Sequence, residues 1–189
     1  MISVLYVLAE GDDDQRFFER VVGPPLEARG CALKVVQHSG WSSKKLRQMI
    51  ASLASMARRM SVGFVYVADL CGAPCVTARK DKIKQKFGTR IPVDRIAVVA
   101  EEIESWYLAG VHDKTAKGLG IRDQIGATES ITKEEFDRMR PRRSSRVDVL
   151  QQMLNRYDLQ LAQDRNRSLR YFVKKWIVAN DCAGGVIEG

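Results

Sequence analysis

Four short apolar runs alternate with stretches whose apolar residues recur at helical spacing. The runs are Ile2–Ala9, Ala32–Gln37, Val62–Ala68 and Arg95–Ala100. Continuous runs rich in β-branched and aromatic residues, such as VGFVYVA, are typical of strands buried on both faces. Strands that alternate with helices form βαβ units, whose strands are parallel. The first 110 residues therefore predict a Rossmann-like α/β domain, with a mainly parallel sheet flanked by helices.

The stretches after the four runs predict four helices, at Asp12–Val22, Leu46–Met60, Thr77–Phe87 and Ile103–Leu108. The first has an acidic first turn, which suits the positive end of the helix dipole. Pro24 and Pro25 are expected to end it, because proline lacks the amide hydrogen that an inner helical position needs.

The chain beyond residue 110 predicts a helical region after an irregular connection at Gly110–Ser130. Thr132 and Glu135 have the spacing of a capping box at a helix start. Two apolar stripes at helical spacing follow, Val147/Leu150/Leu154/Tyr157 and Leu169/Phe172/Val173/Trp176. We therefore expect a core of residues 1–110 and a helical, basic C-terminal extension of residues 111–189 packed on it.

Length and composition favour one globular protein. The chain has 189 residues, 45% hydrophobic and 29% charged, which is ordinary for a globular domain. No apolar run reaches the roughly 18 residues needed to span a bilayer, and the first run lacks the basic start of a signal peptide. These features predict a cytoplasmic protein without a membrane partner.

The four cysteines, Cys31, Cys71, Cys75 and Cys182, show no framework spacing. In a cytoplasmic protein they are expected to be reduced thiols. Cys71 and Cys75 stand four apart, unlike the spacing that zinc sites favour, and the chain has only two histidines. A structural zinc site is not expected.

The excess positive charge lies near the C-terminus. The segment from Arg138 to Lys175 has eleven basic and three acidic residues, which equals the net charge of +8 of the whole chain. Such asymmetry favours a polyanionic partner, with nucleic acid first. The alternative is a solvated helical surface. The residues expected to bind the nucleic-acid backbone are Arg142, Arg143, Arg146, Arg167, Arg170 and Lys174.

Acidic residues follow three of the four expected strands. Glu10 follows the first and Asp69 the third, while the fourth is followed by Glu101, Glu102 and Glu104. Functional groups of open parallel sheets gather beyond the carboxyl ends of the strands. Clustered carboxylates with few histidines favour Mg²⁺ or Mn²⁺. The alternative interpretation is that each acid only stabilises the start of the following helix.

Three motifs resemble the Toprim family. Glu10–Asp14 (EGDDD), after a buried strand and before Phe17 and Phe18, is similar to the Toprim "EGxxD…F" opening. The segment Asp69–Gly72 (DLCG) stands where that fold carries its DxD motif. Glu104–Ala109 (ESWYLA) resembles a segment of small Toprim-like proteins related to OLD-type nucleases. The resemblance covers about 110 residues. It rests on the order of the three motifs along the chain and on their position after predicted strands.

The resemblance implies a Mg²⁺ (or Mn²⁺) site for phosphodiester cleavage or transfer, as in primases, topoisomerases and nucleases. Glu10 would be the general acid or base and Asp69 a metal ligand. The chain departs from the motif at its second acidic position, which is Cys71, because thiolate is a poor partner for Mg²⁺.

Several interpretations follow from this departure. Either Glu101, Glu102 or Glu104 completes the metal site, or catalysis has been lost. We therefore expect a metal-dependent nuclease whose ligands are Glu10, Asp69, Glu101 and Glu104. The alternatives are a catalytically degenerate accessory module that binds nucleic acid or protein, and a basic surface for self-assembly or for a protein partner in a multi-component system.

Overall fold

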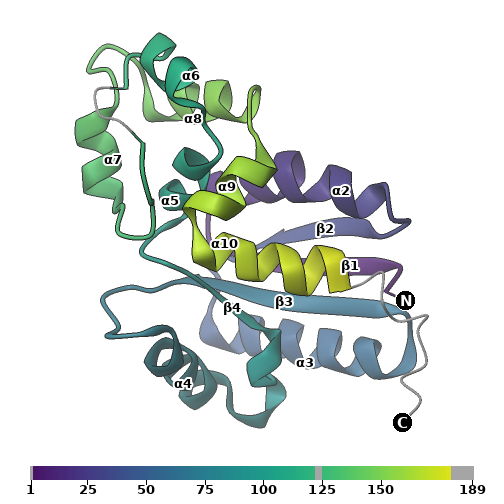
Figure 1. The fold of residues 1–189 in the computed structure, drawn as a ribbon. Coiled ribbons are helices and arrows are strands. Elements are labelled where there is room, and N and C mark those ends of the chain that lie inside the picture. The colour runs from purple at the N-terminus through teal and green to yellow at the C-terminus, as the bar shows by residue number, and fades with distance from the viewer. Residues whose placement is uncertain (1, 122–124, 180–189) are drawn as a thin grey trace, which may run out of the picture. The chain divides into compact units, whose positions relative to one another are not determined.

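The computed structural model describes residues 2–121 and 125–179 (Figure 1). The described chain groups into two compact units. The first comprises residues 2–68, 73–98 and 172–179, and the second comprises residues 69–72, 99–121 and 125–171. The division expected at residue 110 stays a prediction, and Cys182 lies outside the described residues.

A four-stranded sheet forms the centre of the first unit. Its strands are β1 (Val4–Ala9), β2 (Ala32–Gln37), β3 (Val62–Asp69) and β4 (Ile96–Val99), in the order β2-β1-β3-β4. All strands are parallel, and Leu8 pairs with Val36 on one side and with Tyr66 on the other. The predicted α/β class and parallel sheet are confirmed, and the arrangement is consistent with a Rossmann-like fold.

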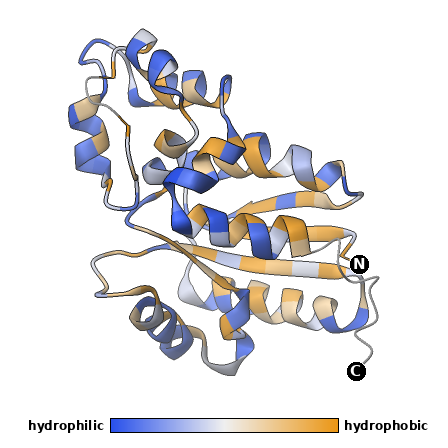
Figure 2. Ribbon diagram, in the orientation of Figure 1, coloured by the Kyte–Doolittle hydropathy of each residue, from blue (hydrophilic) through white to orange (hydrophobic). Residues whose placement is uncertain are grey.

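The strands form because their apolar side chains are buried on both faces of the sheet. Residues 62–68 of β3 are all buried, and so are all four residues of β4. Each large apolar side chain that is fully buried contributes roughly 1.5–3 kcal/mol. Figure 2 shows β1 and β3 mainly in the hydrophobic colour. The strand β2 is partly exposed, as expected at the edge of a sheet.

One face of the sheet is covered by the segments that join β1 to β2 (Figure 1). These are α1 (Asp12–Phe17), the π-helical turn η1 (Phe18–Val22) and α2 (Gly23–Glu27). The expectation that Pro24 and Pro25 end the helix is wrong. Both prolines lie in the first turn of α2, where an amide hydrogen has no helical partner and proline is tolerated.

The opposite face carries α3 (Ser43–Arg59) and α4 (Val76–Phe87), followed by the short turns η2 (Gly88–Arg90) and η3 (Val93–Arg95) (Figure 1). The hydroxyl of Ser42 accepts a hydrogen bond from the Lys45 amide and caps α3. Leu46, Ile50 and Leu53 are buried, as the helical spacing predicts.

The last described helix of the first unit, η4 (Val173–Val178), packs on the same face as η1. The ring centroids of Phe18 and Phe172 lie 5.4 Å apart. The ammonium group of Lys175 donates a hydrogen bond to the Asp94 carbonyl at 2.5 Å. The expected stripe of Leu169, Phe172, Val173 and Trp176 is buried and therefore confirmed.

The described helices of the second unit are α5 (Ile103–Ala109), α6 (Asp113–Gly118), α7 (Lys133–Met139), α8 (Arg146–Leu154), α9 (Leu159–Arg165) and α10 (Arg167–Phe172), whose last residue belongs to the first unit. Helix α5 is buried along its whole length and contacts α7, α8 and α9. The capping box of Thr132 and Glu135 is confirmed at the start of α7.

Two sequence expectations for the second unit are wrong. The connection Gly110–Ser130 was expected to be irregular, yet Asp113–Gly118 forms α6. The stripe assigned to α8 is also shifted, because Val147 is 42% exposed while Val149, Leu150 and Met153 are buried. None of the helices in the described ranges is long and apolar enough to cross a membrane.

Candidate functional site

The acidic segment after β1 separates into one exposed glutamate and three aspartates with structural partners. Asp12 accepts a hydrogen bond from the Gln37 side chain at 2.8 Å, and Asp13 forms an ion pair with Arg16. Asp14 accepts a hydrogen bond from the Gly11 amide at 3.1 Å, which closes the start of α1. The Glu10 side chain is exposed and has no hydrogen bond or ion pair to the described residues. Glu10 is therefore the acid of this segment that is available to a ligand.

Two titratable groups of the first unit lie near Glu10. Burial raises the pKa of Asp14 to about 6, and the charge of Glu10 adds to this effect. Burial lowers the pKa of His38, whereas the charge of Glu10 acts in the opposite direction. The backbone continues the pairing of β1 and β2 beyond the strands, because the amide of Ser39 donates to the Glu10 carbonyl at 3.0 Å. Backbone hydrogen bonds thus hold Glu10 at the end of β1.

His38 lies near Glu10, and no sequence motif indicated it. Its side chain is 9% exposed, and its ring stacks on Tyr66 of β3 with centroids 5.4 Å apart and planes 10° apart. The Nε2 atom has no hydrogen bond within the described residues.

Asp69 and the segment after it belong to the second unit, as do the acids that follow β4. The amide of Leu70 lies 3.1 Å from the carbonyls of both Val99 and Glu101. The segment 69–72 is therefore joined directly to the end of β4.

Two residues other than glycine in these connected segments adopt the left-handed backbone conformation. The φ angle is 49° at Cys71 and 55° at Glu101. Side chains other than glycine rarely adopt this conformation, and it costs about 1–3 kcal/mol. Such strain is concentrated at ligand sites and switches, so its presence at both strand ends favours a functional role for these turns.

The three glutamates after β4 differ in their surroundings. Glu101 is half-buried, and Glu102 accepts a hydrogen bond from the Lys133 amide at 2.5 Å. Glu104 is only 2% exposed and forms an ion pair with Arg146 of α8. The pair supports a structural interpretation for both partners, although each was expected to bind a ligand.

A buried polar network holds the turn after β4. Asn166 is fully buried, and its carbonyl oxygen accepts hydrogen bonds from the Ser168 hydroxyl at 2.7 Å and the Leu169 amide at 3.0 Å. The Ser168 hydroxyl in turn accepts from the Ala100 amide at 3.2 Å and from the Trp106 indole at 2.8 Å. A satisfied network of this kind rigidifies its surroundings. No sequence motif indicated it, because its members are up to 68 residues apart.

The described residues meet only part of the ligand requirements of the predicted Mg²⁺ or Mn²⁺ site. Glu10, Asp69 and Glu101 offer the hard oxygen atoms that Mg²⁺ and Mn²⁺ prefer. Glu104 fits less well, because Arg146 already balances its charge. Within the described ranges, no group of three or more histidine, cysteine and acidic residues is arranged to hold a metal ion.

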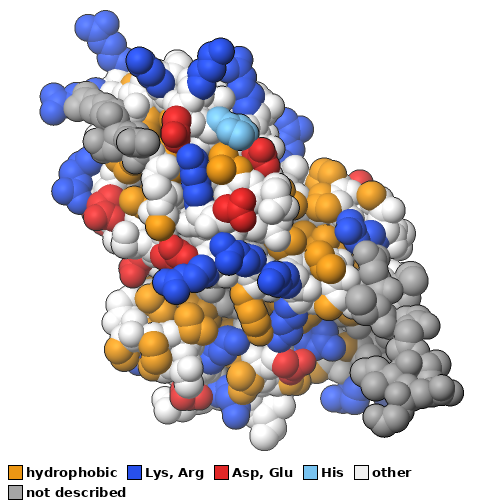
Figure 3. Space-filling view, in the orientation of Figure 1, with side chains coloured by type: hydrophobic (Ala, Val, Ile, Leu, Met, Phe, Trp, Pro, Cys, Tyr) orange, Lys and Arg blue, Asp and Glu red, His pale blue; other side chains and the backbone are white. Residues whose placement is uncertain are grey.

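The basic residues expected to bind nucleic acid are also in different situations. Arg142 and Arg143 are exposed. Arg167 is 83% exposed but pairs with Glu129, whereas Arg170 donates hydrogen bonds to the carbonyls of Gln163 and Asp164. Lys174 is exposed on η4, in the first unit. Figure 3 shows basic side chains gathered over α9 and α10 of the second unit. Their role in binding stays a prediction.

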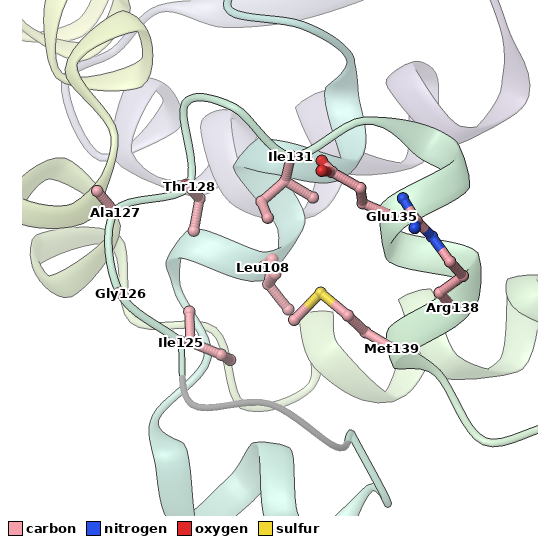
Figure 4. A pocket seen from close by; sticks show the side chains of 9 residues that line it. All are labelled: Leu108, Ile125, Gly126, Ala127, Thr128, Ile131, Glu135, Arg138 and Met139. Atoms are coloured by element: carbon pink, nitrogen blue, oxygen red, sulfur yellow. The ribbon is translucent and has the colours of Figure 1, made fainter.

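A cavity of about 420 Å³ lies in the second unit, and its described lining contains none of the predicted site residues (Figure 4). Leu108, Ile131 and Met139 form much of its wall. Its charged residues, Glu135 and Arg138, make hydrogen bonds that serve the start and the backbone of α7. None of the candidate metal-binding carboxylates described above is among the described residues that line the cavity.

Comparison of the chain with protein-family models, with curated proteins and with solved structures finds no match.

Proposed function

We propose that this protein is a Toprim-like, metal-dependent enzyme that cleaves or transfers phosphodiesters of nucleic acid. The strand order supports the proposal. In the sheet, β1 has β2 as its neighbour on one side and β3 on the other, so the chain changes direction across the sheet between β2 and β3. Ligands of open α/β sheets bind at such a switch point, beyond the carboxyl ends of the strands. Glu10 follows β1, and Asp69 is the last residue of β3.

One observation carries the proposal. Of the acids in the EGDDD segment, Asp12, Asp13 and Asp14 all have partners that explain their presence, whereas Glu10 is exposed and has none within the described residues. An acid that only stabilised a helix start would be expected to resemble its three neighbours. The Toprim resemblance gives Glu10 the role of general acid or base, which requires an accessible carboxyl group.

In this proposal Glu10 of the first unit and Asp69 and Glu101 of the second are the candidate oxygen donors to a metal ion, whereas Glu104 pairs with Arg146 of α8. A bound Mg²⁺ or Mn²⁺ would polarise the phosphate and promote ionisation of a water or hydroxyl nucleophile. Glu10 would then accept or donate a proton at that nucleophile or at the leaving oxygen. The left-handed turns at Cys71 and Glu101 support this assignment, because strained backbone is typical of ligand-binding turns.

A second function is favoured by Cys71. This thiol occupies the second acidic position of the motif and is exposed. A chain that has lost a metal ligand would keep the fold and bind nucleic acid or protein without chemistry. Replacing Cys71 by aspartate distinguishes the two functions. Cleavage that appears only in the Cys71→Asp protein would establish the degenerate site.

The test of the proposal is cleavage of labelled DNA and RNA, single-stranded and duplex, with Mg²⁺ or Mn²⁺. Glu10→Gln should lower the rate about 100- to 10,000-fold, the usual range for loss of a general acid or base. Asp69→Asn should raise the metal concentration needed for activity. Glu27→Gln is the matched control, because Glu27 is also exposed in the first unit but lies at the end of α2. A parent that cleaves none of these substrates refutes the enzymatic proposal.

A further inference from the structure

A second region of strong positive charge lies outside the C-terminal segment. Residues 42–90 contain eleven basic residues and two acids, a net charge of +9. The sum over the whole chain conceals this region, because residues outside it and outside 138–175 carry an equal negative charge. Helix α3 itself contains five basic residues and no acid. This charge is therefore a local property of the first unit.

The basic side chains of this region border a groove along α3. Two adjoining hollows of about 230 and 270 Å³ share Ala51 and Arg90. Lys44 and Arg47 line the first hollow, and Arg58 lines the second. Five of the α3 residues that border the groove are spaced three or four apart and so lie on one face of the helix (Lys44, Arg47, Ala51, Ala54 and Arg58); Gln48 of α3 also lines the first hollow. Arg90 reaches the groove from η2, which contacts α3.

The four cations of the groove have no carboxylate partner in the described chain. Neither hollow has an acidic residue in its described lining. Lys44, Arg58 and Arg90 are exposed, and Arg47 is half-buried. The structure gives none of the four an ion pair or side-chain hydrogen bond within the described residues. Their charges are therefore balanced by solvent ions, which a polyanion could displace.

The shape of the groove selects among polyanions. Between Lys44 and Arg58 the helix rises about 21 Å, at 1.5 Å per residue. The lining includes the small side chains of Ala51 and Ala54 between the cations, which leaves room for a narrow chain of phosphates to approach the helix. A membrane-binding helix instead presents large apolar side chains among its cations, and the described lining of this groove has none.

We infer that the α3 groove, formed by Lys44, Arg47, Arg58 and Arg90, binds the phosphate backbone of a nucleic-acid strand. The inference deepens the proposed function, on which its choice of nucleic acid rests, but it concerns binding and not cleavage. Contacts of this kind are made to phosphates and are independent of base sequence. The first unit, which also contains Glu10, would therefore bind the phosphate backbone of the nucleic acid through this groove.

The inference is tested by fluorescence anisotropy with a labelled single-stranded oligonucleotide of mixed sequence, in EDTA. Without a divalent metal, binding is measured separately from the metal site. The groove variant combines Arg47→Gln, Arg58→Gln and Arg90→Gln. Its affinity should fall at every salt concentration, and the slope of log K against log salt should decrease by about 2, at about 0.7 for each lost contact on a single strand.

The matched control combines Arg59→Gln, Lys82→Gln and Lys84→Gln. These exposed residues lie on α3 and α4 outside the groove, and their replacement removes the same total charge. The control should keep most of the slope, because only general charge is lost. A groove variant and a control that weaken binding equally refute the groove as the site. Circular dichroism verifies that both variants fold.

Three other results also decide the inference. A parent that does not bind the oligonucleotide overturns it. Tighter binding to vesicles that contain phosphatidylserine, lost in the groove variant, overturns it in favour of a membrane surface. A parent that binds through the groove but cleaves nothing when Mg²⁺ or Mn²⁺ is added supports the inference, while it refutes the enzymatic proposal.

Discussion

The ion pair between Glu104 and Arg146 leads to a quantitative prediction for the second unit. The Glu104 carboxylate is 2% exposed, and the Arg146 side chain is 19% exposed. Replacing Arg146 by methionine keeps most of the aliphatic length of the side chain but removes the charge. The carboxylate is then buried without its cation, which costs about 3–5 kcal/mol of unfolding free energy.

Replacing Glu104 instead of Arg146 should lower the unfolding free energy by less. Glu104→Gln leaves the cation on Arg146, which is more exposed than its partner and can be hydrated in part. The double variant Glu104→Met/Arg146→Met has no buried charge, and apolar replacement of a buried ion pair is often neutral or stabilising. We therefore expect the double variant to be at least about 2 kcal/mol more stable than Arg146→Met alone, with a correspondingly large coupling free energy.

The assay is urea denaturation of the parent, both single variants and the double variant. Tryptophan fluorescence is a suitable signal because Trp106 of α5 is fully buried in the same unit. Arg143→Met is the matched control, since Arg143 is an exposed arginine three residues before Arg146. It should change stability by less than about 0.5 kcal/mol. If Arg146→Met behaves like this control, the pair does not stabilise the unit, and Glu104 returns to the set of candidate metal ligands.

Three further predictions concern single side chains. Burial raises the pKa of Asp14 to about 6 from 3.8, so the protonated form is favoured in the fold and stability should fall by about 3 kcal/mol between pH 4 and pH 6. Asp14→Asn should remove this contribution in urea titrations at several pH values; an unchanged pH profile contradicts it. Gly110→Ala places a Cβ atom 2.4 Å from the Tyr157 ring and should lower stability by roughly 1–3 kcal/mol; a thermal melt equal to that of the parent contradicts the packing. Glu101→Gly relieves a left-handed glutamate and should raise stability by up to about 1 kcal/mol while cleavage decreases. Glu101→Gln keeps the strain, so a similar gain in this variant refutes the backbone argument.

The parallel α/β architecture could be predicted because the pattern of apolar residues indicates both the strands and the helices between them. Residues 32–37 form a strand with the expected bounds, and β3 extends the expected strand by Asp69 alone. Burial of a strand on both faces needs a continuous apolar run, which is visible in the sequence. The capping box at Thr132 was predictable for a similar reason, since its two residues lie in one turn of the helix.

Local rules failed where two contexts compete. Pro24 and Pro25 normally end a helix, but they are equally suited to the first turn of a new one. The sequence cannot distinguish these roles, because the choice depends on how η1 and α2 pack against β2. Val147 and Val149 present a similar ambiguity on α8. Both are apolar, and packing of the helix decides which of them is buried.

The candidate site shows what a sequence leaves hidden. Glu104 and Arg146 were each expected to bind a ligand, because an acid after a strand and an arginine in a basic segment are typical of binding sites. Their ion pair joins positions 42 residues apart, and such pairing depends on tertiary structure. The charge of α3 was visible in the sequence, but only a count over local segments separates it from the acidic residues that offset it.

We propose that Glu10 and Asp69 are both needed for the binding of a divalent metal ion. The most direct test of this claim is the binding of Mn²⁺, followed by electron paramagnetic resonance and calorimetry, to the parent, Glu10→Gln, Asp69→Asn and the control Glu27→Gln. We expect the parent and the control to bind Mn²⁺ and Mg²⁺ to compete with it, and both site variants to bind Mn²⁺ at least about tenfold more weakly. A parent that binds no Mn²⁺ even with an oligonucleotide present, or site variants that bind like the parent, would contradict the claim.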